Sequence, residues 1–163
     1  MADKIISQEF LKEIFDYKDG NLYWVKPLSS KAKSRKIAGN INKKGRAIGI
    51  YNKNYLAHRL IFLWHYGYLP KYIDHIDGNP FNNRIENLRS ATHQQNMFNT
   101  KKPVTNTSGY KNVSWQTNVK KWRVRLKINN KTKQFGVYES IEEANRVAIN
   151  LRKMYFGEFA RDV

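Results

Sequence analysis

The sequence Tyr72-Ile73-Asp74-His75-Ile76-Asp77-Gly78-Asn79 sets a carboxylate beside an imidazole and ends in a tight polar turn. Asp77-Gly78-Asn79-Pro80 is strong turn chemistry, because glycine adopts positive φ and proline holds its own φ at about −65°. After the turn, residues 85–91 can return as a short strand, and Thr92 is a good N-cap for a helix through Asn99. The stretch therefore predicts a strand, a loop, a second strand and a helix.

Asp74 and His75 combine an anionic oxygen with an imidazole at adjacent positions. On an extended strand adjacent side chains leave opposite faces, so one site can use both only if the backbone bends or a helix closes over it. Asn96, on the predicted helix, is able to face this pair. Taken alone, an Asp-His pair is also typical of an exposed strand end beside a turn.

The ordered combination is more specific than the pair. With Asn82-Asn83, Asn87-Leu88-Arg89 and Gln95-Asn96, the stretch resembles the HNH nuclease motif in its phage homing-endonuclease form. His75 stands at the first position of the motif, Asn87 at the second and Asn96 at the third, where other members carry His. The resemblance covers roughly residues 20–100 and implies a ββα-metal module over residues 72–99.

Such a module implies a division of labour among four residues. His75 is suited to take a proton from the attacking water, because histidine changes charge near neutral pH. Asp74 and Asn96 offer hard oxygen ligands for one Mg²⁺ or Mn²⁺ ion, which would serve as Lewis acid and stabilise the leaving group. Asn87 is expected to cross-link the loop between the strands by side-chain to backbone hydrogen bonds, which fixes His75.

Several neighbours leave alternatives open. Asp77 is the rival metal ligand, with a turn role as its other interpretation. His58 begins a mostly apolar segment that predicts a buried core helix over residues 57–67, and it is either a packed histidine or a metal or catalytic residue. The remaining amides of the loop are interpreted as turn residues: Asn79, Asn82 and Asn83.

The charge indicates a polyanionic partner. Lys and Arg number 30 against 13 Asp and Glu, a formal net charge of +17, and self-repulsion makes such an excess costly without one. From Lys26 to Lys53 no acidic residue occurs, so the basic strand and loop region 20–55 is interpreted as lying along phosphates, or else as a solvated basic loop. The predicted DNA contacts of the first domain are Lys43, Lys44, Arg46, Arg59, Arg84 and Arg89.

A second domain is expected after a linker. The nuclease domain is assigned to residues 1–100, the linker to 101–107 and the second domain to 108–163. Three short strands follow in the second domain, and the middle one alternates cleanly between apolar and basic side chains. Ser140 then caps a helix, so the sequence predicts a three-stranded antiparallel sheet packed on one helix, with a basic outer face.

The second domain resembles a known DNA-binding family. Ser108-Gly109-Tyr110-Lys111-Asn112-Val113-Ser114-Trp115, Lys121-Trp122-Arg123-Val124-Arg125 and Phe135-Gly136-Val137-Tyr138 are similar to the plant ethylene-response-factor (apetala-two) domain. In that family the sheet lies in the major groove of DNA. The resemblance implies contacts by Lys111, Ser114, Gln116, Arg123, Arg125, Lys127 and Gln134. Plant members carry Arg and Trp where this chain has Ser114 and Gln134, so base preference is not transferred.

Composition excludes several classes of protein and of site. Cysteine is absent, which excludes disulfides and cysteine-based zinc sites. No apolar run approaches the ~20 residues that a membrane span needs, so we expect a cytoplasmic protein. The helices and sheets predicted for the two domains make the expected fold class α+β. We expect double-stranded DNA as the partner, no protein partner is evident, and a monomer or weak dimer is expected. A non-catalytic DNA-binding protein is the main alternative. An RNA-binding protein is a third interpretation, but this sequence has no recognisable motif for binding single-stranded RNA.

Overall fold

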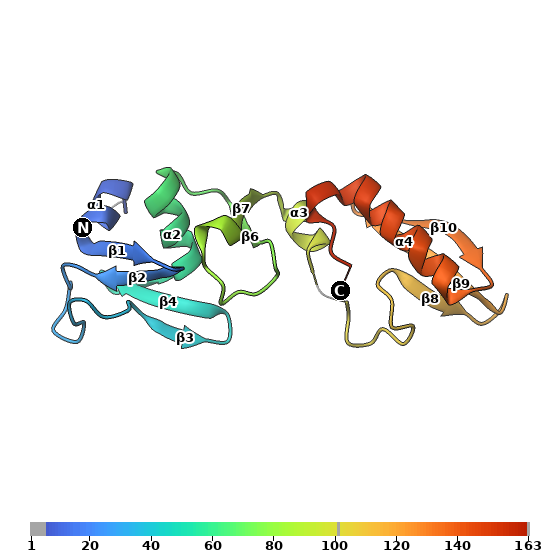
Figure 1. Cartoon of the computed structure of the whole chain (residues 1–163), viewed down its shortest axis with the longest axis horizontal. Helices are drawn as coiled ribbons and strands as arrows, with labels where there is room; N and C mark the ends of the chain where they lie inside the picture. Colours follow the sequence, from blue (N-terminus) through green and yellow to red (C-terminus); the bar gives the residue numbers. More distant parts are fainter. Residues whose placement is uncertain (1–5, 101, 163) are drawn as a thin grey trace. The chain divides into compact units, whose positions relative to one another are not determined.

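The computed structural model describes residues 6–100 and 102–162. Residues 1–5, 101 and 163, which the predicted domains and linker include, lie outside the described residues. The chain has a mixed α/β fold with several small antiparallel sheets (Figure 1). It divides into two compact units, the first ending at Ala91 and the second beginning at Thr92.

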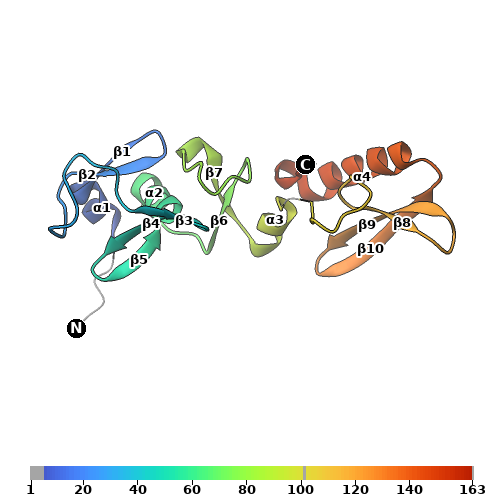
Figure 2. The same ribbon diagram turned by 90° about the horizontal axis from the view of Figure 1, so that it is seen from below.

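The first unit consists of two helices and three small sheets. Helix α2 lies beside the β1–β2 hairpin and the β3–β4–β5 sheet in both views (Figures 1 and 2). Its elements are α1 (Gln8–Ile14), β1 (Phe15–Lys18), β2 (Asn21–Trp24), β3 (Asn40–Asn42), β4 (Gly45–Ile50), β5 (Lys53–Leu56), α2 (Ala57–Tyr66), β6 (Tyr72–His75), the 3₁₀ turn η1 (Ile85–Asn87) and β7 (Leu88–Ala91).

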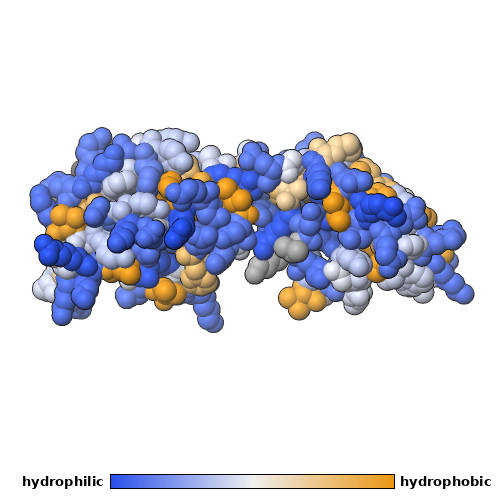
Figure 3. Space-filling model, in the orientation of Figure 1, coloured by the Kyte–Doolittle hydropathy of each residue, from blue (hydrophilic) through white to orange (hydrophobic). Residues whose placement is uncertain are grey.

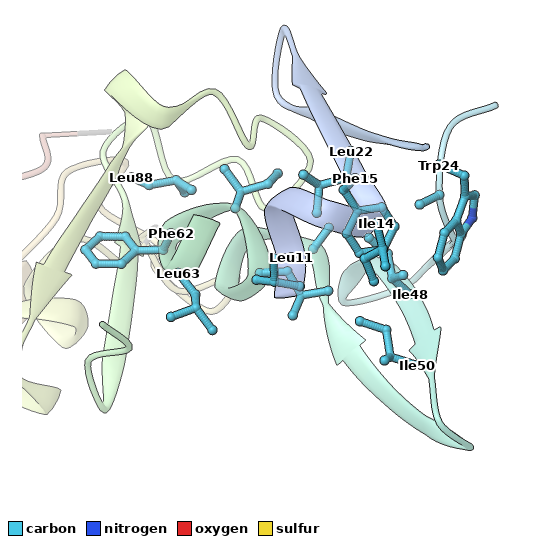
Figure 4. Close-up of a cluster of buried hydrophobic side chains, with 14 of the residues drawn as sticks. Leu11, Ile14, Phe15, Leu22, Trp24, Ile48, Ile50, Phe62, Leu63 and Leu88 are labelled. Atoms are coloured by element: carbon cyan, nitrogen blue, oxygen red, sulfur yellow. The ribbon is translucent and has the colours of Figure 1, made fainter. Parts of the chain in front are cut away.

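The core of this unit forms around α2. Leu60, Ile61, Phe62 and Leu63 are buried and belong to one hydrophobic core with side chains of α1, β1, β2 and β4 (Figure 4). The sequence predicts a buried helix over 57–67, and the helix ends at Tyr66 because Gly67 takes a left-handed conformation at the C-cap. This core anchors both ends of the segment that carries Asp74 and His75.

The second unit consists of a three-stranded antiparallel sheet and two helices. Its elements are α3 (His93–Phe98), β8 (Val113–Gln116), β9 (Lys121–Ile128), β10 (Lys131–Tyr138), α4 (Ile141–Phe156) and the 3₁₀ turn η2 (Gly157–Phe159). The strand order is β10-β9-β8, and α4 runs along one face of the sheet in both views (Figures 1 and 2). The sheet and its single long helix have the layout that the sequence predicts.

Helix α3 packs within the second unit. The rings of Phe98 and Phe156 stack with centroids 3.7 Å apart, and Lys111 Nζ donates to the carbonyls of Phe98 and Thr100. The division of the chain therefore falls ahead of the predicted linker at 101–107, because these contacts tie α3 to the core of the second unit. Within the part of the chain that the structure describes, none of the helices is long and apolar enough to cross a membrane.

Candidate active site

Strands β6 and β7 place Asp74 opposite Arg89 and His75 opposite Leu88. The Nε and Nη2 atoms of Arg89 lie 2.9 and 2.8 Å from Asp74 Oδ2. The Asp74 side chain is 4% exposed and that of Arg89 13% exposed, so the ion pair is largely removed from water. Arg89, predicted as a phosphate contact, is instead the counter-ion of the predicted metal ligand.

His75 is oriented by an amide eight positions further along the chain. Its Nε2 lies 3.0 Å from Asn83 Oδ1, and Asn83 is 5% exposed. An amide oxygen only accepts hydrogen bonds, so this contact is a hydrogen bond in the tautomer that carries the proton on Nε2. The sequence interpretation assigned Asn83 a turn role and missed this contact; no local pattern separates Asn83 from its asparagine neighbours.

His58 packs against His75. Their ring centroids are 5.0 Å apart with planes at 75°, an edge-to-face contact between the start of α2 and the end of β6. Burial, with the charge that His75 carries when it is protonated and the charge of Arg59, lowers the pKa of His58 to about 4. His58 is therefore neutral at pH 7 and stands beside His75 without adding a charge.

Asp77 is the centre of a hydrogen-bonded loop. Its carboxylate accepts from the Asn79 backbone N–H at 2.8 Å, from Asn82 Nδ2 at 2.7 Å and from Asn87 Nδ2 at 2.9 Å. Burial alone would raise the pKa of Asp77, but these bonds and the charge of His75 outweigh it and hold the pKa below its usual value. The Asp77 carboxylate thus accepts hydrogen bonds within the turn. This corresponds to the turn role that the sequence analysis gave as the alternative to metal binding.

Asn87 closes the same loop from the opposite side. Its Oδ1 accepts from the Asp77 backbone N–H at 3.0 Å, and its Nδ2 donates to the Asn82 carbonyl at 2.8 Å. The Asn87 carbonyl also accepts from the Ile76 N–H, directly after His75. Asn87 therefore makes the side-chain to backbone cross-links predicted for it.

Two hairpin turns support the loop. The backbone of Gly20, in the β1–β2 turn, packs so closely that an added Cβ would lie 2.8 Å from Arg84 N. In the β3–β4 turn, a Cβ on Gly45 would lie 2.9 Å from the Pro80 carbonyl, and its φ of +118° also favours glycine. The Asp77–Asn83 loop is thus held from outside as well as from within.

The predicted basic contacts of the first unit fall into two groups. Lys43 and Lys44 are exposed in the β3–β4 turn beside the loop, and Arg84 is exposed within 3.6 Å of Asp19. Arg46 Nη1 donates to the Gly39 carbonyl, while Arg59 donates to the carbonyls of two residues that follow α2, Pro70 and Lys71. Arg46 and Arg59 therefore hydrogen-bond to backbone carbonyls, whereas Lys43, Lys44 and Arg84 are exposed.

Asn96 lies on α3, in the second unit, where its backbone N–H donates to the Thr92 carbonyl. Asp74 and His75 belong to the first unit, so the placement of Asn96 beside them stays a prediction. Among residues 6–100 and 102–162 no group of three His, Asp or Glu side chains is arranged to hold a metal ion. The hard oxygen of Asp74 suits Mg²⁺ or Mn²⁺, but an ion there must share the carboxylate with Arg89.

The sheet of the second unit presents a polar face away from α4. Val113, Val124 and Leu126 are buried toward the helix, and the alternation places the basic and amide side chains opposite. Ser114 pairs with Arg123, and Gln134 with Arg125. The predicted contacts on this face are Ser114, Gln116, Arg123, Arg125, Lys127 and Gln134.

Lys111 differs from the other predicted contacts of the second unit. It is buried, and its ammonium donates to the backbone carbonyls of Phe98, Thr100 and Arg161. Burial and the charges of Arg152 and Arg161 outweigh the opposing effect of Asp162 and lower the pKa of Lys111 to about 8. The ammonium is engaged by protein, so Lys111 is not carried forward as a DNA contact.

Comparison with known proteins relates one part of the chain to a known family. A family described as HNH endonuclease matches residues 55–98, which include α2, β6, the loop, β7 and α3. Protein 3.8 of Escherichia phage T7 is 39% identical over 97 residues, which cover 58% of this chain and 79% of that protein. An uncharacterized HNH endonuclease, L560, of Acanthamoeba polyphaga mimivirus is 38% identical over 106 residues, 63% of this chain and 54% of that protein.

No solved structure matches the chain significantly. The region that matches the family contains His75, Asn83, Asn87 and the buried Asp74. Residues 55–98 of the chain thus match the HNH endonuclease family.

Proposed function

We propose that this protein is a metal-dependent, site-specific DNA endonuclease of the homing type that hydrolyses phosphodiester bonds. The observation that carries the proposal is the anchoring of His75: its Nε2 is bound to Asn83 at 3.0 Å inside the segment that matches the HNH family. In the tautomer with the proton on Nε2, Nδ1 is the nitrogen proposed to take the proton from water. The imidazole then acts as general base without needing to reorient.

Asp74 and Asn96 are the proposed ligands of one Mg²⁺ or Mn²⁺ ion, a pairing that follows from the family resemblance. The ion, when bound, supplies charge stabilisation to the phosphate and the leaving oxygen. Arg89 holds the Asp74 carboxylate in a fixed orientation through a hydrogen bond from Nε and an ion-pair contact from Nη2, both to Oδ2. A preset carboxylate lowers the reorganisation needed when DNA and the ion arrive.

The second unit is proposed to position the enzyme on DNA through the polar face of its sheet, as in the apetala-two family. Gln116 Oε1 and Arg123 Nε on this face are buried and have no hydrogen-bond partner among the described residues. Buried polar atoms in this state require water or a ligand as partner. The basic side chains of β9 on this face favour DNA as the ligand of the sheet.

A non-catalytic DNA-binding protein is the second candidate, and the Arg89–Asp74 pair is the observation that favours it. A guanidinium neutralises the carboxylate that a metal ion would use. Both candidates bind DNA, so only cleavage separates them.

The deciding experiment is cleavage of supercoiled plasmid and phage DNA in Mg²⁺, Mn²⁺ or EDTA. Wild type is compared with His75→Ala and with His65→Gln, a control at the opposite end of α2 whose Nδ1 bonds to the Ile61 carbonyl. We expect metal-dependent nicked or linear product with wild type and the control, and none with His75→Ala. If all three proteins bind DNA and none cuts it in any metal, the non-catalytic candidate replaces the nuclease.

A further inference from the structure

The loop that begins at His75 carries exposed apolar side chains. Phe81, at its tip, is 51% exposed, and Ile76, the residue after His75, is also exposed. Single exposed apolar residues are common, and Figure 3 shows several scattered over a mostly hydrophilic surface. Exposure of Phe81 alone therefore does not indicate a binding site. The backbone and the charges around Phe81 are what distinguish it.

The backbone around Phe81 is fixed. The Phe81 N–H donates to Asn79 Oδ1 at 3.1 Å, the Asn79 N–H donates to Asp77, and Asn82 Nδ2 returns to Asp77 at 2.7 Å. Gly45 packs against Pro80, directly before Phe81. The loop therefore holds the ring outward on a rigid support, so that placing it in a ligand would cost little conformational entropy.

The surroundings of Phe81 are basic. Lys43 and Lys44 are exposed in the turn that ends at Gly45, next to Pro80, and the segment from Lys26 to Lys53 has no acidic residue. An apolar group next to exposed lysines is complementary to a surface with phosphates outside and stacked bases inside. Double-stranded DNA has that layout, and apolar wedges of other proteins enter between its base steps and kink it.

From this arrangement we propose that Phe81 is a wedge that enters the duplex between adjacent base pairs, beside the phosphate presented to His75, while Lys43 and Lys44 hold the flanking backbone. The inference rests on the proposed function for the choice of DNA as ligand, but not on cleavage. Unstacking at the wedge would expose the scissile phosphate to His75, because kinking changes the path of the backbone there. Phe81 is thus a DNA-deforming residue and takes no part in the chemistry.

The test measures DNA unwinding without cutting. Relaxed plasmid is saturated with His75→Ala protein in EDTA, treated again with a metal-independent topoisomerase and deproteinised, and its linking number is read on a gel. Insertion of a side chain between base pairs unwinds the duplex, so this parent protein is expected to shift the linking number. Adding Phe81→Ala should abolish the shift at equal saturation, whereas adding Phe81→Leu should keep most of it.

Two controls separate the wedge from affinity and from folding. Leu69→Ala removes an exposed apolar side chain elsewhere in the same unit and should leave the shift unchanged. Lys43→Gln with Lys44→Gln should require more protein for saturation and then give the same shift. The proposal is overturned if Phe81→Ala unwinds as the parent does, or if the parent saturates the plasmid without changing its linking number. Failure of wild type to cut, with unwinding intact, would instead remove only the nuclease proposal.

Discussion

Asn83 Oδ1 lies 3.0 Å from His75 Nε2 although the residues flank a loop and are eight positions apart. The contact selects the tautomer of the imidazole, because the amide oxygen accepts only from a protonated Nε2. In that tautomer the His75 ring acts as a base through Nδ1. The relationship gives a test of how His75 is used.

Replacing Asn83 by aspartate keeps the acceptor and the shape but adds a negative charge beside the ring. The carboxylate stabilises the imidazolium over the neutral imidazole, so the acidic limb of the cleavage-rate profile should move to higher pH by roughly one unit. Asn79→Asp, which changes a neighbouring loop amide without touching His75, is the matched control. A profile for Asn83→Asp that coincides with wild type would show that His75 is not the titrating base.

His58 should make stability depend on pH. Its pKa is about 4 in the folded protein and about 6.5 in the unfolded chain, so the unfolded state binds more protons between these values. Stability is therefore lost as pH falls from about 6.5 to about 4, by up to roughly 3 kcal/mol. Urea unfolding at pH 7 and pH 4.5 measures the loss, which should shrink in His58→Gln. An equal loss in wild type and variant would contradict the burial argument.

The Asp74–Arg89 pair should be coupled in stability. Arg89→Met leaves a buried carboxylate without its counter-ion and should cost about 3 kcal/mol, whereas Asp74→Asn with Arg89→Met should cost less than the two single changes summed. A double-mutant cycle by urea unfolding measures this coupling. Lys26→Met, which breaks an exposed ion pair with Glu13, should change stability little and serves as the reference. Additive effects at Asp74 and Arg89 would mean that the pair is loose in solution.

Variants of Lys111 and Arg125 should have different effects, because the Lys111 charge is structural and the Arg125 charge is proposed to contact DNA. Arg125→Gln removes a positive side chain from the exposed face and should reduce the slope of log affinity against log salt by about 0.9 for each phosphate that the variant no longer neutralises. Lys111→Met removes a buried ammonium that holds three carbonyls, so it should lower the unfolding temperature and leave the salt slope unchanged. Binding isotherms at several salt concentrations, with thermal unfolding alongside, measure both. A salt slope altered by Lys111→Met would return that residue to the DNA surface.

Local chemistry made much of the secondary structure predictable. Thr92 and Ser140 cap α3 and α4 as expected, since N-capping depends only on a short side chain and the next turn of backbone. The Asp77 turn and the Asn87 cross-link follow from similarly short-range bonds. The apolar run of α2 predicts its burial for the same reason: hydrophobic periodicity is a local property.

Pairings across the chain were decided by tertiary structure. Strand register sets Asp74 opposite Arg89, and the closing of the loop brings Asn83, rather than another of its asparagines, to His75. Lys111 stands at a position predicted to contact DNA, but it is buried, and its ammonium donates hydrogen bonds to carbonyls at the end of α3. By itself the sequence determined which groups are available for chemistry, from residue type and local backbone preference; only packing and register, which depend on distant contacts, decided which of those groups meet.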